Sequence, residues 1–168
     1  MLIIAESAKI SRFADIEDSV RGSRIIIGER TSIDSFVKIK PAGGSGDCEI
    51  GDDTAINVGV AIYTGNGVKI GSKCLIAANT VISPVTHAYM KKDVPIREQG
   101  FVPPGTLFNP RPGIVIEDDV WIGANCTVLE GARIGQGAVV TAGSVVKGVL
   151  EPYGVYAGSP LKLVSRRR

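Results

Sequence analysis

The chain has 168 residues, of which 44% are hydrophobic and 5% are aromatic, which suits one domain with a core of small and branched aliphatic side chains. Its formal net charge of +2 gives no argument for nucleic-acid binding, and we expect the locally basic residues 165–168 to be solvated. Residues 1–10 include Glu6 and Lys9 and do not resemble a signal peptide, and no apolar run reaches the roughly 18 residues of a membrane span, so we expect a cytoplasmic protein.

Branched apolar residues recur every six positions along most of the chain, in blocks separated by insertions. A helix would place them three or four apart and a simple strand two apart, so this spacing predicts short strands interrupted by regular corners. In chain order these positions are Ile4, Ile10, Ile16, Ile27, Ile33, Ile39, Ile50, Ile56, Ile62, Ile70, Ile76, Ile82, Ile116, Ile122, Val128, Ile134, Val140 and Val146.

Two further positions of each hexad have a constant character. The third residue after the apolar one is often Gly, Asn or Asp, which tolerate a positive φ, and the fourth is small. Corner residues of this kind are Asp53, Gly59, Gly65, Asp119, Asn125, Gly131, Gly137 and Gly143, and small ones are Ala8, Ala14, Val20, Thr31, Val37, Cys74, Thr80, Thr86, Val120, Cys126, Ala132, Ala138 and Ser144. Three such sides close a triangular coil, so we predict an all-β parallel β-helix of about six coils.

Two segments depart from the repeat. Residues 88–113 contain five prolines and no hexads, and are too long for an idle connection, which predicts a functional excursion loop. Residues 148–168 are predicted to form a C-terminal extension, with a bent strand or hairpin around Pro152 and Pro160 and a final helical turn over residues 161–168. We treat residues 1–168 as a single domain.

The three cysteines, Cys48, Cys74 and Cys126, are odd in number and lack the spacing of metal ligands. Two of them fall on the small inward position of the hexad. We therefore expect buried thiols in a reducing compartment.

His87 is the only histidine, and it lies at the end of the fourth coil where the long loop begins. A lone histidine is more often structural, but at the edge of a rigid stack a general base is both exposed to substrate and held still. A single histidine cannot supply a three-histidine zinc site, so carbonic anhydrases with this winding are disfavoured. No nucleophile elbow, P-loop or dinucleotide fingerprint occurs either.

A family resemblance rests on the second half of the chain. The segments that carry it are Val120-Trp121-Ile122-Gly123, Gly131, Ile134-Gly135, residues 142–146 and Ala157-Gly158-Ser159-Pro160. Together with His87 they resemble the signature of the hexapeptide-repeat acetyltransferases, in particular the galactoside, maltose and xenobiotic group, over about residues 50–162. Residues 95–100 also resemble members that O-acetylate bacterial capsule or lipopolysaccharide sugars. The resemblance implies a left-handed β-helix, acetyl-CoA as co-substrate without a metal, and a homotrimer with active sites between subunits.

The resemblance also implies roles for single residues. His87 matches the catalytic histidine that takes a proton from the acceptor as its oxygen attacks the thioester, with no acyl-enzyme. Trp121 matches a tryptophan that lines the acetyl and acceptor end of the site, although it would also suit an outer packing face. The residues expected along coenzyme A are Gly123, Ala124, Ala142 and Gly143, and the candidates for its phosphates are Lys147, Lys162, Arg166 and Arg167.

The acceptor side departs from the family pattern. The acceptor-binding Asn or Asp of the third coil corresponds to Gly59, so recognition here differs or uses Asn57. Glu98 in the loop is a further candidate, either for substrate binding or for orienting His87.

The expected function is transfer of an acetyl group from acetyl-CoA to a sugar hydroxyl of a bacterial surface polysaccharide or its precursor. Two alternatives stay open. One is N-acetylation of a nucleotide-linked amino sugar, which uses the same donor and base. The other is a non-catalytic structural β-helix, in which His87 and Trp121 only pack.

Overall fold

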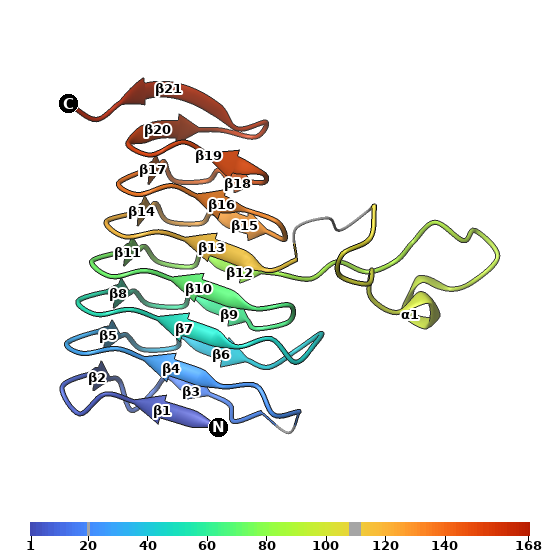
Figure 1. Ribbon diagram of the computed structural model, residues 1–168, viewed down its shortest axis with the longest axis horizontal. Coiled ribbons are helices and arrows are strands. Elements are labelled where there is room, and N and C mark those ends of the chain that lie inside the picture. The colour runs from blue at the N-terminus through green and yellow to red at the C-terminus, as the bar shows by residue number, and fades with distance from the viewer. Residues whose placement is uncertain (20, 108–111) are drawn as a thin grey trace.

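The computed structural model describes residues 1–19, 21–107 and 112–168, and in these ranges the chain winds into a triangular prism with one long loop leaving its side (Figure 1). Strands of one face run across the front of Figure 1 away from the loop, and the chain returns behind them as it climbs, so the winding is left-handed. The predicted left-handed parallel β-helix is confirmed.

Three sheets form the faces of the prism. Sheet A holds β1 (Leu2–Ile4), β4 (Ile25–Ile27), β7 (Cys48–Ile50), β10 (Val68–Ile70), β13 (Ile114–Ile116), β16 (Arg133–Ile134) and β19 (Val149–Leu150). Sheet B holds β2 (Lys9–Ile10), β5 (Ser32–Ile33), β8 (Ala55–Ile56), β11 (Leu75–Ile76), β14 (Trp121–Ile122), β17 (Val139–Val140), β20 (Gly154–Ala157) and β21 (Lys162–Arg166). Sheet C holds β3 (Asp15–Ile16), β6 (Lys38–Lys40), β9 (Ala61–Tyr63), β12 (Val81–Ser83), β15 (Thr127–Leu129) and β18 (Val145–Val146). The described residues thus complete six coils, from β1–β3 to β16–β18, as the repeat predicts.

Successive coils pair in parallel, so that each hexad isoleucine or valine lies over its counterpart. Ile27 pairs with Ile50, and Ile70 pairs with Ile116 across the long insertion. The hexad residues of the second to sixth coils are almost fully buried, whereas Ile4 of the first coil is 41% exposed because no coil lies beneath it. The core is therefore one column of aliphatic side chains along the prism axis.

The predicted corner residues have a positive φ, and the small residues that follow them in the last complete coils are buried. The φ values are 54° at Asp53, 70° at Gly59, 36° at Gly65, 59° at Asp119, 54° at Asn125, 81° at Gly131, 67° at Gly137 and 72° at Gly143. Val20, predicted as a small inward residue, lies outside the described residues.

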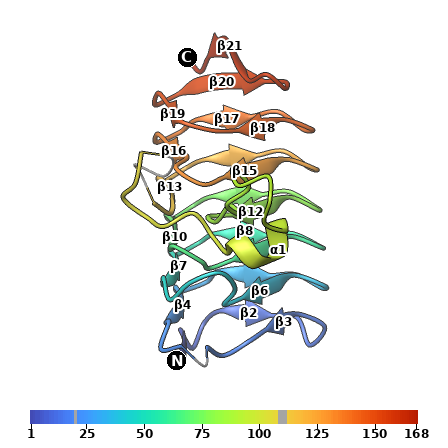
Figure 2. The same cartoon turned by 90° about the vertical axis from the view of Figure 1, so that its right-hand side faces the viewer.

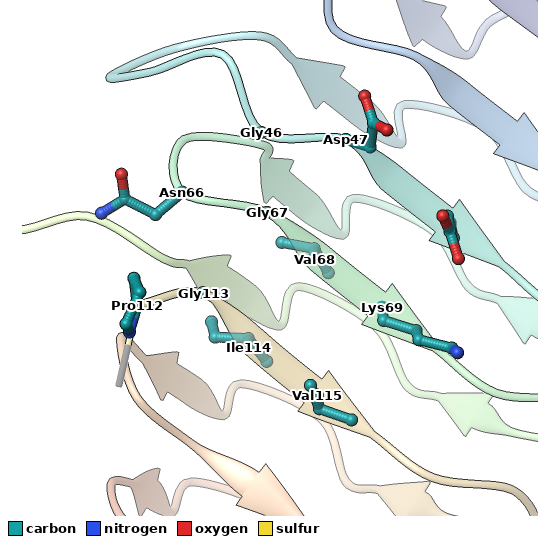
Figure 3. A pocket seen from close by; sticks show the side chains of 11 residues that line it. Gly46, Asp47, Asn66, Gly67, Val68, Lys69, Pro112, Gly113, Ile114 and Val115 are labelled. Atoms are coloured by element: carbon teal, nitrogen blue, oxygen red, sulfur yellow. The ribbon is translucent and has the colours of Figure 1, made fainter. Parts of the chain in front are cut away.

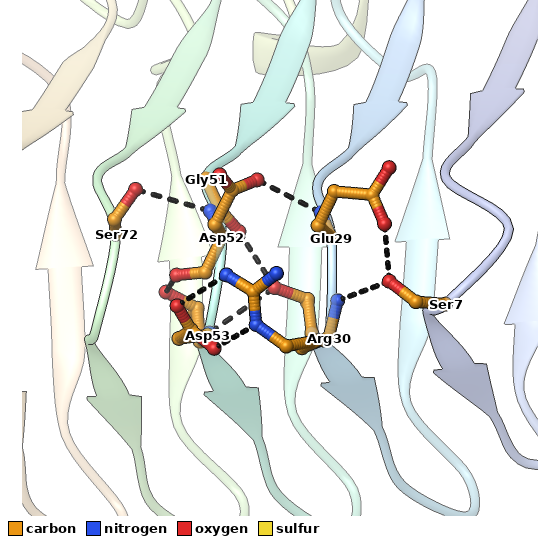
Figure 4. Close-up of polar contacts among 9 residues, drawn as sticks. Ser7, Glu29, Arg30, Gly51, Asp52, Asp53 and Ser72 are labelled. Carbon is orange, nitrogen blue, oxygen red and sulfur yellow. Dashed lines mark hydrogen bonds and ion pairs between the residues drawn. The ribbon is translucent and has the colours of Figure 1, made fainter.

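The three corners of the prism differ, and we name each by the sheets that it joins. Corner AB carries a polar ladder (Figure 4), in which the Glu29 N–H donates to Asp52 Oδ1 (2.8 Å) and the Asp52 N–H to Ser72 Oγ (3.0 Å). An ion pair joins Arg30 to Asp53 in the coil above (2.6 Å). These side chains occupy backbone N–H groups that the turns leave free, so corner AB is structural.

Corner CA receives the insertions of the chain. The segments between β3 and β4, β6 and β7, and β12 and β13 all leave the prism there. They contact one another, because a Cβ on Gly43 would lie 2.9 Å from the side chain of Val85. The long loop, predicted for residues 88–113, projects from this corner and carries the short helix α1 (Ile96–Gln99); its residues 108–111 lie outside the described residues.

The C-terminal extension corrects one expectation. The winding continues through β19 and β20 beyond Val146, and Lys162–Arg166 then forms β21, antiparallel to β20, instead of a helical turn. The hairpin predicted around Pro160 is present. A strand replaces the expected helical turn because the exposed edge of β20 offers backbone hydrogen bonds to residues 162–166.

Candidate active site

Corner BC brings together the four residues expected along coenzyme A. Gly123 and Ala124 follow β14, and Ala142 and Gly143 follow β17 one coil higher. The Gly143 N–H donates to the Ala124 carbonyl over 2.9 Å. A Cβ on Gly123 would lie only 2.5 Å from the backbone nitrogen of Ala142, so glycine permits the close stacking of these two turns. Ala142 and Gly143 are exposed, which leaves a smooth backbone strip on the outside of the corner.

The four candidate cations do not gather at this strip. Lys162 pairs with Ala157 at the upper end of corner BC, which continues the strip. Arg166 forms an ion pair with Glu151, and the Arg167 guanidinium donates to Asp119 Oδ2 (2.8 Å) and to the Gly137 carbonyl (2.9 Å) at corner AB. Lys147 follows β18 at corner CA. Of the four, the structure places only Lys162 beside the expected path of coenzyme A.

His87 lies at the root of the long loop, exposed to solvent. Its Nδ1 is 3.2 Å from the Gly100 carbonyl oxygen, and its ring packs on Phe101 with 4.4 Å between centroids. A carbonyl only accepts, so this contact requires a proton on Nδ1, and the neutral ring then keeps its lone pair on Nε2. The middle of the loop therefore folds back onto the imidazole, whose second nitrogen is available as a base.

Glu98 does not orient His87 in the described part of the chain. It lies on α1 with an exposed side chain, and its backbone N–H donates to the Pro95 carbonyl over 2.9 Å. The Gly100 carbonyl occupies the position expected for a carboxylate, which corrects that expectation. Sequence reasoning missed Gly100 and Phe101 as partners because a backbone carbonyl and a loop aromatic leave no spacing signal.

The loop also has an internal support that the sequence did not indicate. The Gln99 side chain accepts from the Lys91 N–H (3.1 Å) and donates to the carbonyls of Lys91 (2.8 Å) and Val94 (2.7 Å). One side-chain amide thus closes the turn that precedes Gly100 and Phe101, the two residues that contact His87. These hydrogen bonds fix the backbone of the loop immediately before Gly100.

Trp121 and Asn57 lie on other parts of the surface. Trp121 is 48% exposed on the outer face of sheet B, between Leu75 and Val139 in register. Asn57 follows β8 and lines a cavity of about 480 Å³ with Lys9, Ile10, Ser11, Ser32, Ile33 and Asp34. His87 follows sheet C and projects from corner CA, so one chain does not assemble the whole predicted site.

A second cavity, of about 270 Å³, lies on sheet A where the long loop returns (Figure 3). It is lined by Asp47, Glu49 and Lys69 together with the backbone of Gly67 and Gly113, and contains none of the predicted site residues. Among the described residues, no cluster of three or more His, Cys, Asp or Glu side chains could hold a metal ion. The same residues include no helix that is long and apolar enough to cross a bilayer.

Comparison with known proteins relates this geometry to a family. The model for bacterial transferase hexapeptide (six repeats) matches residues 113–148, and that for the hexapeptide repeat of succinyl-transferase matches residues 47–84. A putative lipopolysaccharide biosynthesis O-acetyl transferase, WbbJ of Escherichia coli (strain K12), is 35% identical over 125 residues, which cover 74% of this chain and 63% of that protein. Residues 47–84 and 113–148 are thus similar to the hexapeptide repeats of bacterial transferases, and the similarity to acetyltransferases extends over most of the chain.

A further relative of the chain is the probable acetyltransferase Rv3034c of Mycobacterium tuberculosis (strain ATCC 25618 / H37Rv), 25% identical over all 168 residues and 51% of its own length. The chain thus spans between about half and two thirds of these two relatives, 51% and 63%. Among solved structures, a mutant of AntD, an N-acyltransferase from Bacillus cereus in complex with dTDP-4-amino-4,6-dideoxyglucose and Coenzyme A, has a TM-score of 0.79 and 25% identity, over 99% of this chain and 84% of that one. The hexapeptide-repeat containing acetyltransferase VCA0836 from Vibrio cholerae has a TM-score of 0.63 and 28% identity, over 81% and 73%.

Proposed function

We propose that the protein is an acetyl-CoA-dependent O-acetyltransferase that acts on a sugar hydroxyl of a surface polysaccharide or its precursor, with His87 as the general base. The observation that carries the proposal is the contact of His87 Nδ1 with the Gly100 carbonyl oxygen (3.2 Å). With Nδ1–H bound to the Gly100 carbonyl, Nε2 is free to accept a proton at the edge of the prism.

The reaction then follows as direct transfer. Nε2 of His87 accepts the proton of the sugar hydroxyl while the oxygen forms a bond to the acetyl carbonyl carbon. The tetrahedral intermediate collapses with cleavage of the C–S bond, and the thiolate of coenzyme A takes the proton from the imidazolium. The Gly100 carbonyl stabilises the charged ring that exists between these two steps.

We further propose that the site is completed by a neighbouring copy in a trimer. His87 leaves from corner CA and the smooth strip of Ala142 and Gly143 lies on corner BC, so the base of one prism would face the donor strip of the next. Trp121 on sheet B would then border the same groove. Mass measurement in solution by light scattering tests the trimer, and a monomer at working concentration would contradict it.

The test of the base is replacement of His87. We expect His87→Ala to lower the rate of thiol release from acetyl-CoA by about 10² or more, because general base catalysis contributes about 10²–10⁴. Thr86→Ala is the matched control, since this neighbouring exposed side chain takes no part in the proposal. Turnover of His87→Ala within a few fold of the control would rule out the base.

N-acylation of an amino sugar is the second candidate, and the similarity to AntD along almost the whole chain favours it. A hydroxyl acceptor and its amino analogue, compared in one thiol-release assay, separate the two. Release that depends on the amine alone would replace O-acetylation. The structural alternative predicts no binding of acetyl-CoA in calorimetry.

A further inference from the structure

Corner BC changes character between the third and fourth coils. Above this level most turn residues are small, and below it most are large, polar or aromatic. The upper set includes Ala77, Ala78, Gly123, Ala124, Ala142, Gly143 and Gly158, and the lower set includes Ser11, Arg12, Phe13, Asp34, Ser35, Phe36, Asn57 and Val58. If the upper half of corner BC binds acetyl-CoA, the lower half of the same corner is available to bind the acceptor sugar.

Two phenylalanines form the centre of the lower half. Phe13 of the first coil and Phe36 of the second stack with 5.9 Å between ring centroids and 24° between planes. They stay 53% and 62% exposed, and the Arg12 guanidinium lies 4.7 Å from the Phe13 centroid. Phe36 has a φ of 61°, a conformation that favours Gly or Asn. Because both rings stay largely exposed and do not pack into the core, they are available for contact with a ligand.

The coil next to Phe36 on the side away from Phe13 is the third coil. The corner residue of that coil is Gly59, the position at which the sequence departs from the family pattern. The three atoms nearest to an added Cβ on Gly59 all belong to Asn79 of the fourth coil. Gly59 therefore places no side chain beside the turn of Phe36, and the Phe36 ring is 62% exposed.

Polar groups lie on the same turns of corner BC and on the neighbouring strands of sheet B. Asp34 and Asn57 line the cavity of about 480 Å³, and Asp34 uses one carboxylate oxygen to accept from the Ser35 N–H (2.6 Å). Carboxylate and amide groups beside an aromatic ring suit a sugar, whose hydroxyls form hydrogen bonds while its apolar face packs on the ring. Lys9 also lines the cavity, and neither Lys9 nor Arg12 forms an ion pair within the described ranges.

The heights of these groups give an order along the corner. The donor strip lies on the fifth and sixth coils, Phe36 and Asn57 on the second and third, and the cations Lys9 and Arg12 on the first. The long loop descends so that α1 lies at the height of the third coil in both views (Figure 2). A symmetric neighbour would hold its loop at the same height, next to the sugar position.

We propose that the lower half of corner BC binds the acceptor as a sugar with a phosphate on its anomeric carbon. The sugar ring packs on Phe36 and bonds to Asp34 and Asn57, and the phosphate pairs with Lys9 and Arg12. This inference rests on the proposed function and selects a phosphate-linked precursor over a finished neutral polysaccharide. A glycosyl transfer, which breaks the bond to that phosphate, must then consume the acetylated product.

The test compares sugar 1-phosphates with the matching methyl glycosides in calorimetry and in thiol release. We expect at least tenfold tighter binding and lower KM for the phosphates. The variant Lys9→Ala/Arg12→Ala should lose that difference, whereas Arg21→Ala, which removes an exposed cation after the first coil on another corner, should keep it. UDP- and dTDP-sugars and a short polyprenyl diphosphate sugar show which carrier adds further affinity.

Phe36→Asn gives an independent readout. Asn tolerates the positive φ, so the melting temperature should stay equal or rise while the KM of the acceptor increases at least fivefold. Equal affinity for phosphates and methyl glycosides, or an unchanged preference in Lys9→Ala/Arg12→Ala, would overturn the inference. If neutral sugars support thiol release, the proposed function stands even when the phosphate site is refuted. Calorimetry needs no turnover, so it tests the phosphate site even in an inactive protein.

Discussion

Replacement of Gly123 by Ala tests the packing of corner BC and the path of coenzyme A together. The new Cβ would lie 2.5 Å from the Ala142 nitrogen and 2.9 Å from its Cα, so the upper turn must move by about 1 Å to reach ordinary contact distance. Overpacking of this kind costs about 1–3 kcal/mol, which for a chain of this size lowers Tm by roughly 2–12 °C. A misplacement of about 1 Å in a binding backbone should also weaken acetyl-CoA binding about tenfold or more.

Gly51→Ala is the matched control on corner AB. Its Cβ would lie 2.7 Å from the backbone of Gly71 and Ser72, so the strain is similar, but the proposed donor strip is on the other corner. We expect a comparable fall in Tm by differential scanning calorimetry and acetyl-CoA binding within about twofold of wild type by titration calorimetry. If Gly123→Ala binds acetyl-CoA as tightly as Gly51→Ala does, corner BC does not hold the pantetheine arm; an unchanged Tm in Gly123→Ala would refute the packing argument.

Buried groups and the single tryptophan give three more predictions. Thr80 Oγ1 donates to the Gly123 carbonyl (2.9 Å) and accepts from the Cys126 N–H (3.1 Å), so Thr80→Val should lose about 1–3 kcal/mol in denaturant unfolding, and Thr80→Ser should retain most of the stability. Burial raises the pKa of Cys48 to about 12 from an ordinary 9.0, so the folded chain keeps a proton that the unfolded chain releases above pH 9, and the free energy of unfolding should fall as pH rises from 9 toward 12. Alkylation of Cys48 at about pH 8 should accordingly require denaturant, and rapid labelling of the native thiol would contradict its burial. Trp121, as the only tryptophan, should report acceptor or acetyl-CoA binding by a change of fluorescence, which a purely structural outer position would not show.

The winding could be predicted from the sequence because the same three requirements recur in every hexad. The aliphatic residue must fill the axis, the corner residue must accept a positive φ, and the next residue must be small. Arg30 and Lys73 show the limit of this rule, since both adopt a positive φ of 56° and 59° without belonging to the expected types. The stacked coils impose the turn on them.

The C-terminal end was harder to predict because its signals are weaker. Leu150 and Tyr156 take the inward places of β19 and β20, and a tyrosine at such a place hides the aliphatic pattern. The Tyr156 hydroxyl accepts from the Glu151 N–H over 2.8 Å, so its polar end is satisfied at the edge of the core.

The candidate site was predicted unevenly for a physical reason. Gly123 and Ala142 could be related from spacing, because residues of one corner meet whenever the repeat is regular. The partner of His87 is a backbone carbonyl within a loop that has no repeat, so no spacing in the sequence could indicate it. The roles of Lys147, Lys162, Arg166 and Arg167 stay predictions, as do those of Asn57 and Glu98.

The insertions that lengthen a coil all lie at corner CA. After the longest excursion the ladder restarts without a shift, since Val68 pairs with Ile114 as it does with Cys48 below. Corner CA can therefore carry insertions of different length without a change of register: a segment grafted between β12 and β13 should leave the folding of the other coils unchanged.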